Sequence, residues 1–474
     1  MDLHAYARDV APLPDEILHS YGALEPALVA RPRSTDQVSR ILAYANQHGV
    51  PVTPRGGGSS ALGGILPIEG GLVLDLCGLN RVLEINETDA TARVECGLSW
   101  RRLEDRLARH GLCLMAYPSS GVSATVGGYL GSGGGAGIGV PRNGVAGNSV
   151  LSMKVVLPDG AIVETNPWES WTFIGSEGTL GVICEATLKV ARMSAMRCAM
   201  FAFDDLDAGL DALASLSRLR PFFLHFLDRG AARFLVEAGT AHLDDAALTV
   251  IAAFRGTEEE LERVSQEAAR LTKDKARTYP VEMAEKEWRN RFDVEISFKR
   301  LGPTLMVQEI RLPMSSLKPV MRELAVALEG YRWGVQCLSS DHRSICLLIY
   351  ALTDERKKVP FYKALSLARA IPRIGYRHHG TVYGIALHNS SHLRRVHSRE
   401  AVAVMLGLKR RFDPNNILNP SKTVHERVPG ALVDLSMIFM NRFPALTRLG
   451  LALIRRLPKW HIRMGLRMLG GRTR

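Results

Sequence analysis

Apolar residues recur with two periods along this chain, one typical of helices and one typical of strands. Over residues 37–48 they return every three or four positions behind the capping sequence Ser34-Thr35-Asp36, which predicts a helix. Residues 100–110 repeat this pattern and end near Gly111. Short apolar runs bounded by turn residues predict strands between and after these helices. The runs lie at 73–76, 82–85, 92–96, 150–157, 161–164 and 186–190.

Residues 193–370 follow a different pattern and contain few glycines. Short strand-like runs alternate there with longer helical stretches, which indicates an α/β or α+β layer. The predicted strands are 222–227, 248–254, 305–312 and 345–350. The predicted helices are 205–216, 258–275, 316–329 and 360–370.

Three glycine-rich stretches interrupt the N-terminal strands, at residues 54–62, 119–139 and 174–182. Glycine has no Cβ, so it brings backbone N–H groups close to a ligand, and successive N–H groups form a concavity that suits an anion such as pyrophosphate. A single stretch of this kind can equally be a surface turn. Three of them in one region predict a long ligand held along its length, and their spacing does not fit a Rossmann fingerprint.

Five motifs occur in a fixed order along the chain. They are Pro54–Ser60, Ala124–Gly128, Val155–Gly160, Gly175–Ile183 and Phe412–Lys422. The first four resemble the FAD-binding domain of the vanillyl-alcohol oxidase / p-cresol methylhydroxylase (PCMH) flavoprotein superfamily. The fifth is similar to the closing motif of its glycolate oxidase / D-lactate dehydrogenase branch. The resemblance covers residues 24–424 and lies in the ordered set rather than in any one motif.

The resemblance implies an α+β fold in four segments. A two-subdomain PCMH-type FAD-binding domain would occupy residues 1–192, and an α/β cap domain for the substrate would occupy residues 193–370. Residues 371–428 would return to the FAD-binding domain. Residues 429–474 remain as a basic, helical C-terminal tail, in which leucines recur at helical spacing.

The cofactor that the resemblance implies is FAD, held by backbone groups of the three glycine-rich stretches. Relatives that bind FAD covalently often use a histidine of the first stretch, but residues 56–63 are glycine, serine, alanine and leucine. We therefore expect non-covalent FAD, with a tether from elsewhere in the chain left open. The candidate cofactor-binding residues are Arg55, Gly56, Gly57, Gly58, Ser59, Ser60, Ser119, Ser120, Gly121, Thr125, Gly127, Gly128, Gly131, Ser132, Gly181, Val182 and Ile183.

Arg377-His378-His379-Gly380 stands where the glycolate / D-lactate branch carries Ser-Gly-Glu-His-Gly. His379 matches the histidine thought to act on the substrate hydroxyl, and a neutral imidazole is a fitting general base for an alcohol proton. His378 stands in place of the glutamate, and alkyl-dihydroxyacetonephosphate synthase, a relative, has a His-His-His-Gly version. A purely structural role is the alternative for both histidines.

Arg291 ends a Trp-x-x-Arg motif that resembles one in the family. The matching arginine pairs with a substrate carboxylate, for which its planar guanidinium is suited. A surface arginine on the charged helix 282–291 is the alternative, and Arg300 and Arg311 are lesser candidates for the same role. No metal site is expected, because the Asp341-His342 region lacks the family's His-x-Gly-Asp-Gly-x-x-His pattern.

The implied activity is that of an FAD-dependent oxidoreductase that transfers hydride from a CH–OH group to flavin N5. A 2-hydroxy acid such as D-lactate or glycolate is the expected small-molecule substrate. A dehydrogenase that passes electrons to a quinone or protein carrier is favoured over an oxidase. Three alternatives stay open: a lipid-modifying enzyme similar to alkyl-dihydroxyacetonephosphate synthase, a sugar or alditol oxidase, and a non-catalytic flavin-binding subunit of a redox complex.

Composition and charge bear on location and partners. The 474 residues are 46% hydrophobic, as in ordinary soluble proteins, and the seven cysteines show no C-x-x-C motif, which predicts reduced thiols. No signal-peptide pattern is visible, so a cytoplasmic location is expected. Residues 429–474 hold nine basic residues and one acid, +8 of the net charge of +12. This tail is expected to contact a membrane peripherally, or else to pack on the protein itself or a second subunit. No nucleic acid is expected, and the oligomeric state is left open.

Overall fold

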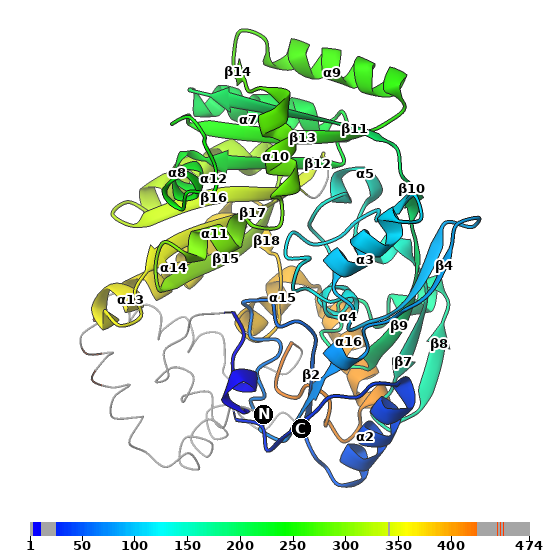
Figure 1. Cartoon of the computed structure of the whole chain (residues 1–474). Helices are drawn as coiled ribbons and strands as arrows, with labels where there is room; N and C mark the ends of the chain where they lie inside the picture. Colours follow the sequence, from blue (N-terminus) through cyan, green and yellow to red (C-terminus); the bar gives the residue numbers. More distant parts are fainter. Residues whose placement is uncertain are drawn as a thin grey trace.

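The computed structural model describes residues 3–10, 25–339 and 342–423, together with Phe443, Leu446 and Leu449. The chain forms two lobes, an N-terminal lobe and a cap lobe, which are the lower and upper parts of Figure 1. The predicted tail lies outside the described residues except for those last three, and so does Asp341.

A small parallel sheet begins the N-terminal lobe, in the order β1-β3-β2. Its strands are β1 (Leu28–Ala30), β2 (Val52–Arg55) and β3 (Leu72–Asp75). The predicted helix between β1 and β2 is confirmed as α2 (Thr35–Gln47), and its N-cap Ser34 accepts a hydrogen bond from the Gln37 amide. Its apolar face is buried, because Val38 and Leu42 lie in the core against β3.

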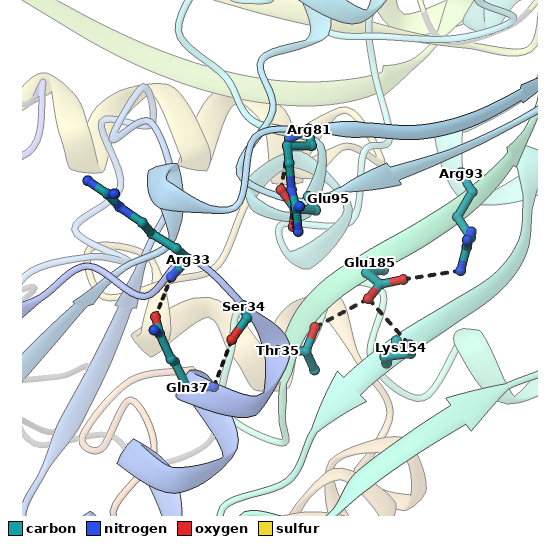
Figure 2. A network of polar contacts seen from close by, with 9 residues as sticks. All are labelled: Arg33, Ser34, Thr35, Gln37, Arg81, Arg93, Glu95, Lys154 and Glu185. Atoms are coloured by element: carbon teal, nitrogen blue, oxygen red, sulfur yellow. Dashed lines mark hydrogen bonds and ion pairs between the residues drawn. The ribbon is translucent and has the colours of Figure 1, made fainter.

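A five-stranded antiparallel sheet forms the second part of this lobe, in the order β4-β5-β9-β7-β8. Its strands are β4 (Val82–Asn86), β5 (Thr91–Glu95), β7 (Val150–Val156), β8 (Ile162–Thr165) and β9 (Val182–Lys189), with α3 (Trp100–Ala108) as the predicted second helix. Figure 2 shows how the two sheets are joined: Glu185 on β9 accepts from Thr35 on α2 at 3.3 Å and pairs with Lys154 on β7.

The cap lobe is built on an eight-stranded sheet, in the order β14-β11-β13-β12-β16-β17-β15-β18. Every strand pair in it is antiparallel, so the cap is an α+β layer. Its strands are β11 (Ala195–Phe203), β12 (Phe223–Asp228), β13 (Leu248–Gly256), β14 (Arg277–Thr278), β15 (Thr304–Pro313), β16 (Arg332–Ser339), β17 (Ser344–Thr353) and β18 (Thr381–Val382).

The two faces of the cap sheet have different neighbours. On β17, Leu347 and Ile349 join the core with the outer helices, whereas Leu348 and Tyr350 join an inner cluster. The outer helices are α7 (Leu206–Ser217), α9 (Glu258–Thr272), α12 (Leu317–Ala327), α13 (Lys358–Leu365) and α14 (Leu367–Arg377). The inner helices are α8 (Arg229–Glu237), α10 (Val281–Arg289) and α11 (Val294–Lys299). The inner face looks toward the N-terminal lobe.

After the cap, the chain returns to the N-terminal lobe through α16 (Arg399–Phe412). The Asp413 carboxylate then accepts from the amides of Ile417 and Leu418, which fixes a tight turn. Beyond it, the Asn419 amide donates to Val52 on β2 at 2.7 Å. The closing motif therefore extends the small parallel sheet. The remaining short elements are η1 (Leu3–Ala7), η2 (Leu76–Gly78), β6 (Leu112–Cys113), α4 (Val126–Gly131), α5 (Val140–Asn143), η3 (Ala146–Ser149), α6 (Pro167–Ser170), β10 (Ala191–Arg192), η4 (Met314–Ser316), η5 (Ser390–His392) and α15 (Leu393–Val396).

Candidate functional site

The fold brings the three glycine-rich stretches together. A Cβ on Gly56 would lie 2.3 Å from the Thr125 hydroxyl, and one on Gly57 would lie 1.7 Å from the Ser123 carbonyl oxygen. The first stretch can therefore touch the second only because it has no side chains there. The third stretch joins them, since the Glu177 amide donates to the Gly131 carbonyl oxygen at 2.8 Å.

Backbone N–H groups at this junction lack partners. Within the described part of the chain, those of residues 56–61 and 119–122 donate no hydrogen bond. Thr125 caps α4 by accepting from the Gly128 amide at 3.2 Å, and this short helix begins beside Gly56. Unpaired N–H groups on two facing loops form a cradle that suits the phosphates of a dinucleotide.

Other candidate cofactor residues have structural contacts of their own. Arg55 turns its side chain toward the N-terminal segment, where it donates to the Arg8 carbonyl oxygen and lies over the Tyr6 ring. A Cβ on Gly181 would meet Val155 at 2.6 Å, so that glycine serves close packing at the start of β9. Val182 and Ile183 are buried in β9, Gly127 packs on Cys96, and Ser132 ends α4 by donating to the Tyr129 carbonyl oxygen.

A buried polar network supports the junction from behind. Glu177 of the third stretch accepts from the Ala386 amide at 2.8 Å, and burial raises the pKa of Glu177 to about 7. Lys422 of the closing motif donates to the Gly64 carbonyl oxygen at 2.9 Å and to Asn419 at 2.6 Å. Burial lowers the pKa of this lysine to about 7. The sequence motifs contained these residues, but only the fold shows that they hold loops from four parts of the chain.

The inner face of the cap presents polar groups to this junction. Arg311 on β15 donates to the Gly135 carbonyl oxygen at 2.6 Å, and its guanidinium lies 5.5 Å from the centre of the Tyr383 ring. The Tyr383 hydroxyl accepts from the Ala136 amide at 2.8 Å. Glu309, two positions from Arg311 on the same strand, is the third polar side chain of this group. In the sequence, the signal for this group is that Glu309 and Arg311 stand two positions apart, on one face of a predicted strand.

A second polar cluster lies farther along the same face. Gln336 on β16 donates to Glu295 at 2.9 Å and also binds the Tyr350 hydroxyl, while its amide oxygen lies 2.9 Å from His225 Nε2. The Ser119 hydroxyl reaches Glu295 at 3.4 Å, so this cofactor candidate bridges the lobes. Ser119, His225, Glu295 and Gln336 line one narrow pocket with apolar walls. Burial raises the pKa of Glu295 and lowers that of His225 to about 4.

Arg291 is held in an ion pair between the lobes. Its Nη2 lies 2.7 Å from both carboxylate oxygens of Glu104 on α3, and its Nε donates to the Tyr117 hydroxyl at 3.2 Å. The guanidinium also lies 4.1 Å from the Trp288 ring. The charge expected to meet a substrate carboxylate is already balanced by Glu104.

The structure does not bring His378 and His379 to the glycine-rich loops. His378 Nε2 lies 2.9 Å from Glu323 on the outer helix α12. His379 is exposed and has a left-handed backbone with φ of 59° at the end of α14. The return segment first reaches the junction at Tyr383 and then at His388, whose amide donates to the Leu62 carbonyl oxygen.

The described residues contain neither a membrane-spanning helix nor a cluster of metal ligands. None of their helices is long and apolar enough to cross a membrane. No group of three or more histidine, cysteine, aspartate or glutamate side chains is arranged there to hold a metal ion.

An N-terminal lobe with a glycine cradle for a dinucleotide, facing a polar cap sheet, defines a flavin-dependent oxidoreductase. Residues 26–166 match the FAD binding domain, and residues 192–423 match the C-terminal domain of FAD linked oxidases. The chain belongs to this family of FAD-linked oxidases, and its cofactor is FAD. The predicted family is confirmed, and so is FAD as the cofactor, whereas its non-covalent attachment stays a prediction.

Relatives cover most of the chain. It is 27% identical over 440 residues to the glycolate oxidase subunit GlcD of Bacillus subtilis, which covers 86% of this chain and 92% of that one. It is 27% identical over 430 residues to a mitochondrial D-lactate dehydrogenase (cytochrome) of Arabidopsis thaliana, covering 85% and 74%. The structure of p-cresol methylhydroxylase with substrate bound superposes with a TM-score of 0.74 at 17% identity, covering 89% and 92%. That likeness shows the fold.

Proposed function

We propose that this protein is an FAD-dependent dehydrogenase that oxidises the CH–OH group of a small 2-hydroxy acid such as D-lactate or glycolate. Its electrons would pass to a quinone or a protein carrier. The relatives named for glycolate and D-lactate support this substrate class. Bound FAD supplies a two-electron hydride acceptor at its flavin N5.

The observation that carries the proposal is Arg311 at the junction of the lobes. Its Nε is buried without a hydrogen-bond partner, and its Nη1 makes none with any described residue. An unused guanidinium edge beside the flavin loops is suited to a substrate carboxylate. Tyr383 and the second glycine stretch fix its orientation.

The residues of the cradle have separate tasks in this proposal. The unpaired N–H groups of residues 56–61 and 119–122 would bind the pyrophosphate of FAD. Gly56 and Gly57 allow the loops to close on it, since a side chain at either position would collide with the second stretch.

Anaerobic mixing of the FAD-loaded protein with D-lactate, L-lactate, glycolate and alditols tests the proposal. We expect one hydroxy acid to bleach the flavin absorbance and an added quinone to restore it. Bleaching by alditols alone would place the substrate in the sugar class. Turnover of a lipid substrate without any bleaching would indicate a reaction with no net electron acceptor, and would refute the dehydrogenase.

The proposal includes a membrane contact through the basic tail, residues 429–474. A segment with this charge would hold the protein peripherally on an anionic cytoplasmic membrane surface, where quinones are available. Flotation with anionic vesicles compares the full chain with one that ends at residue 428. Equal flotation of the two proteins would end the membrane hypothesis.

A further inference from the structure

We infer that Glu309 accepts the proton of the substrate hydroxyl, and that Arg311 holds the substrate carboxylate beside it. This inference rests on the proposed function and names the groups that act in it. Glu309 and Arg311, both on β15, would take the roles that the sequence pattern predicts for His379 and Arg291.

The register of the sheet places both side chains on the inner face. On β15, Ile310 and Leu312 are fully buried in the outer core, so Glu309 and Arg311 point to the opposite side. Glu309 is paired with Leu348 on β17, and Leu348 is paired with Gln336 on β16. Glu309 therefore lies in the same row as the Glu295–Gln336 cluster, on the side nearer to Arg311 and β18.

The Glu309 carboxylate is available to a ligand. It makes no side-chain hydrogen bond or ion pair with any residue that the structure describes, although the side chain is half-buried. No hydrogen bond or ion pair joins it to Arg311, whose Nη2 donates to the Gly135 carbonyl oxygen. A carboxylate without a protein partner at the junction of two lobes can accept a hydrogen bond from a ligand hydroxyl.

The groups around Glu309 favour proton transfer near neutral pH. Burial and the charge of Glu295 on α11 raise the pKa of Glu309 to about 7. Tyr350 on β17 and Tyr383 after β18 also face it, and burial raises the pKa of both hydroxyls, so they stay neutral. The Cys346 thiol on β17 is likewise kept protonated by burial. A base with a pKa close to the working pH is the most effective one.

These two residues and bound FAD account for every proton and electron that leaves the alcohol. The O–H bond of the alcohol breaks, and its proton forms a bond to a Glu309 carboxylate oxygen. The C–H bond would break with both electrons as hydride, for which bound FAD would be the acceptor, and the alcohol carbon would become the carbonyl carbon of a 2-oxo acid. Arg311 keeps its charge throughout and holds the carboxylate. Glu309 then releases its proton to solvent through its partly exposed side.

Binding of oxalate to the FAD-loaded protein tests the inference without turnover. Oxalate is a carboxylate probe whose binding is followed by the flavin spectrum or by calorimetry. An anion at Arg311 binds best while Glu309 is protonated, so its Kd is expected to rise about tenfold per pH unit above about pH 7. In Glu309→Gln the Kd should stay low at every pH, and in Arg311→Met binding should weaken at least about tenfold at every pH.

Two further variants separate this role from a structural one. Glu295→Gln removes the charge that raises the pKa of Glu309, so the rise in Kd should begin at a lower pH. Glu329→Gln makes the same change at an exposed residue just after α12 and should leave the profile of the parent unchanged. With a hydroxy acid that bleaches the flavin, Glu309→Gln should also slow reduction about 100-fold or more.

Two outcomes would overturn the inference. One is a Kd for oxalate that keeps its pH dependence in Glu309→Gln. The other is an absence of oxalate binding between about pH 5 and pH 9 in a protein that holds FAD. In either case, bleaching of the parent by a hydroxy acid would leave the proposed function standing, whereas correct oxalate profiles without bleaching by any hydroxy acid would refute the proposed function alone.

Discussion

Substituting Arg291 by methionine separates a structural arginine from a substrate-binding one. In the structure Arg291 pairs with Glu104 across the two lobes, with both carboxylate oxygens 2.7 Å from one guanidinium nitrogen. The side chains are only 7% and 16% exposed. The Tyr117 hydroxyl also donates to Glu104 at 2.9 Å, so the carboxylate keeps one neutral partner when the arginine is removed.

Arg291→Met should lower the free energy of unfolding, because Glu104 then loses the arginine and keeps only the Tyr117 hydroxyl as a partner. Removing one member of a buried ion pair destabilises a protein by about 3–5 kcal/mol. Because Tyr117 remains and Glu104 is slightly exposed, we expect the lower end, about 3 kcal/mol. Replacing Glu104 by leucine together with Arg291→Met removes both charges and should recover most of this loss.

Urea unfolding of the FAD-free chain measures these differences in a double-mutant cycle. We expect a coupling free energy of at least about 2 kcal/mol between Arg291 and Glu104. The matched control is Arg289→Met, two positions earlier at the end of α10, since Arg289 is 64% exposed and pairs with Glu285 at 3.5 Å. A surface pair of this kind contributes about 0–1 kcal/mol.

Two results would contradict a structural role for Arg291. A coupling below about 0.5 kcal/mol, with unfolding midpoints like that of the parent, would show that the pair does not hold the lobes together. If Arg291→Met also raised the KM for a 2-hydroxy acid, while the kcat and the stability stayed unchanged, the arginine would belong to the substrate site as the sequence pattern predicts.

Four further substitutions and one cofactor measurement test other parts of the structure. Gly57→Ala places a Cβ 1.7 Å from a carbonyl oxygen of the second stretch, so FAD affinity should fall at least about tenfold in a flavin fluorescence titration. Gly407→Ala, in exposed helix with nothing within 4 Å, should leave that affinity unchanged and stabilise by about 0.5–1 kcal/mol. His379→Ala should keep both FAD and turnover, and a loss of turnover with bound FAD would restore its catalytic role. Asp413→Asn leaves the buried Lys409 charge without its partner and should lower stability by about 3 kcal/mol in urea, a change that an unshifted midpoint would contradict. Denaturation followed by filtration should release the yellow colour, and retained colour would show a covalent tether.

Much of the architecture could be predicted from local pattern. The helix behind Ser34 is confirmed because an N-cap and a periodic apolar face act within one segment. The strands predicted at 150–157 and 161–164 are confirmed as β7 and β8 for the same reason, since they are adjacent in the sequence and pair across a turn at Asp159-Gly160. The helix predicted over 360–370 begins correctly but is two helices, α13 and α14, and the second runs on to Arg377 with Pro372 inside it.

Segments whose form depends on distant neighbours could not be predicted in this way. Strands β11 and β16 carry no clear alternation and become strands because the sheet on either side pairs with them. The second glycine stretch was expected as loop, yet it contains α4, whose cap Thr125 packs against Gly56. Tertiary contacts decided each of these cases.

The sequence by itself determined the cofactor loops of this protein, because backbone exposure at Gly56 and Gly57 is a property of the residues themselves. It could not determine which charged groups are free to act. Arg291 and Arg311 are chemically alike. Only in the folded chain does Arg291 pair with Glu104, while Arg311 keeps a buried Nε donor without a partner. The same holds for acids and bases, since a pKa near neutrality at Glu309 comes from burial and from Glu295, neither of which is visible before the sheet is assembled.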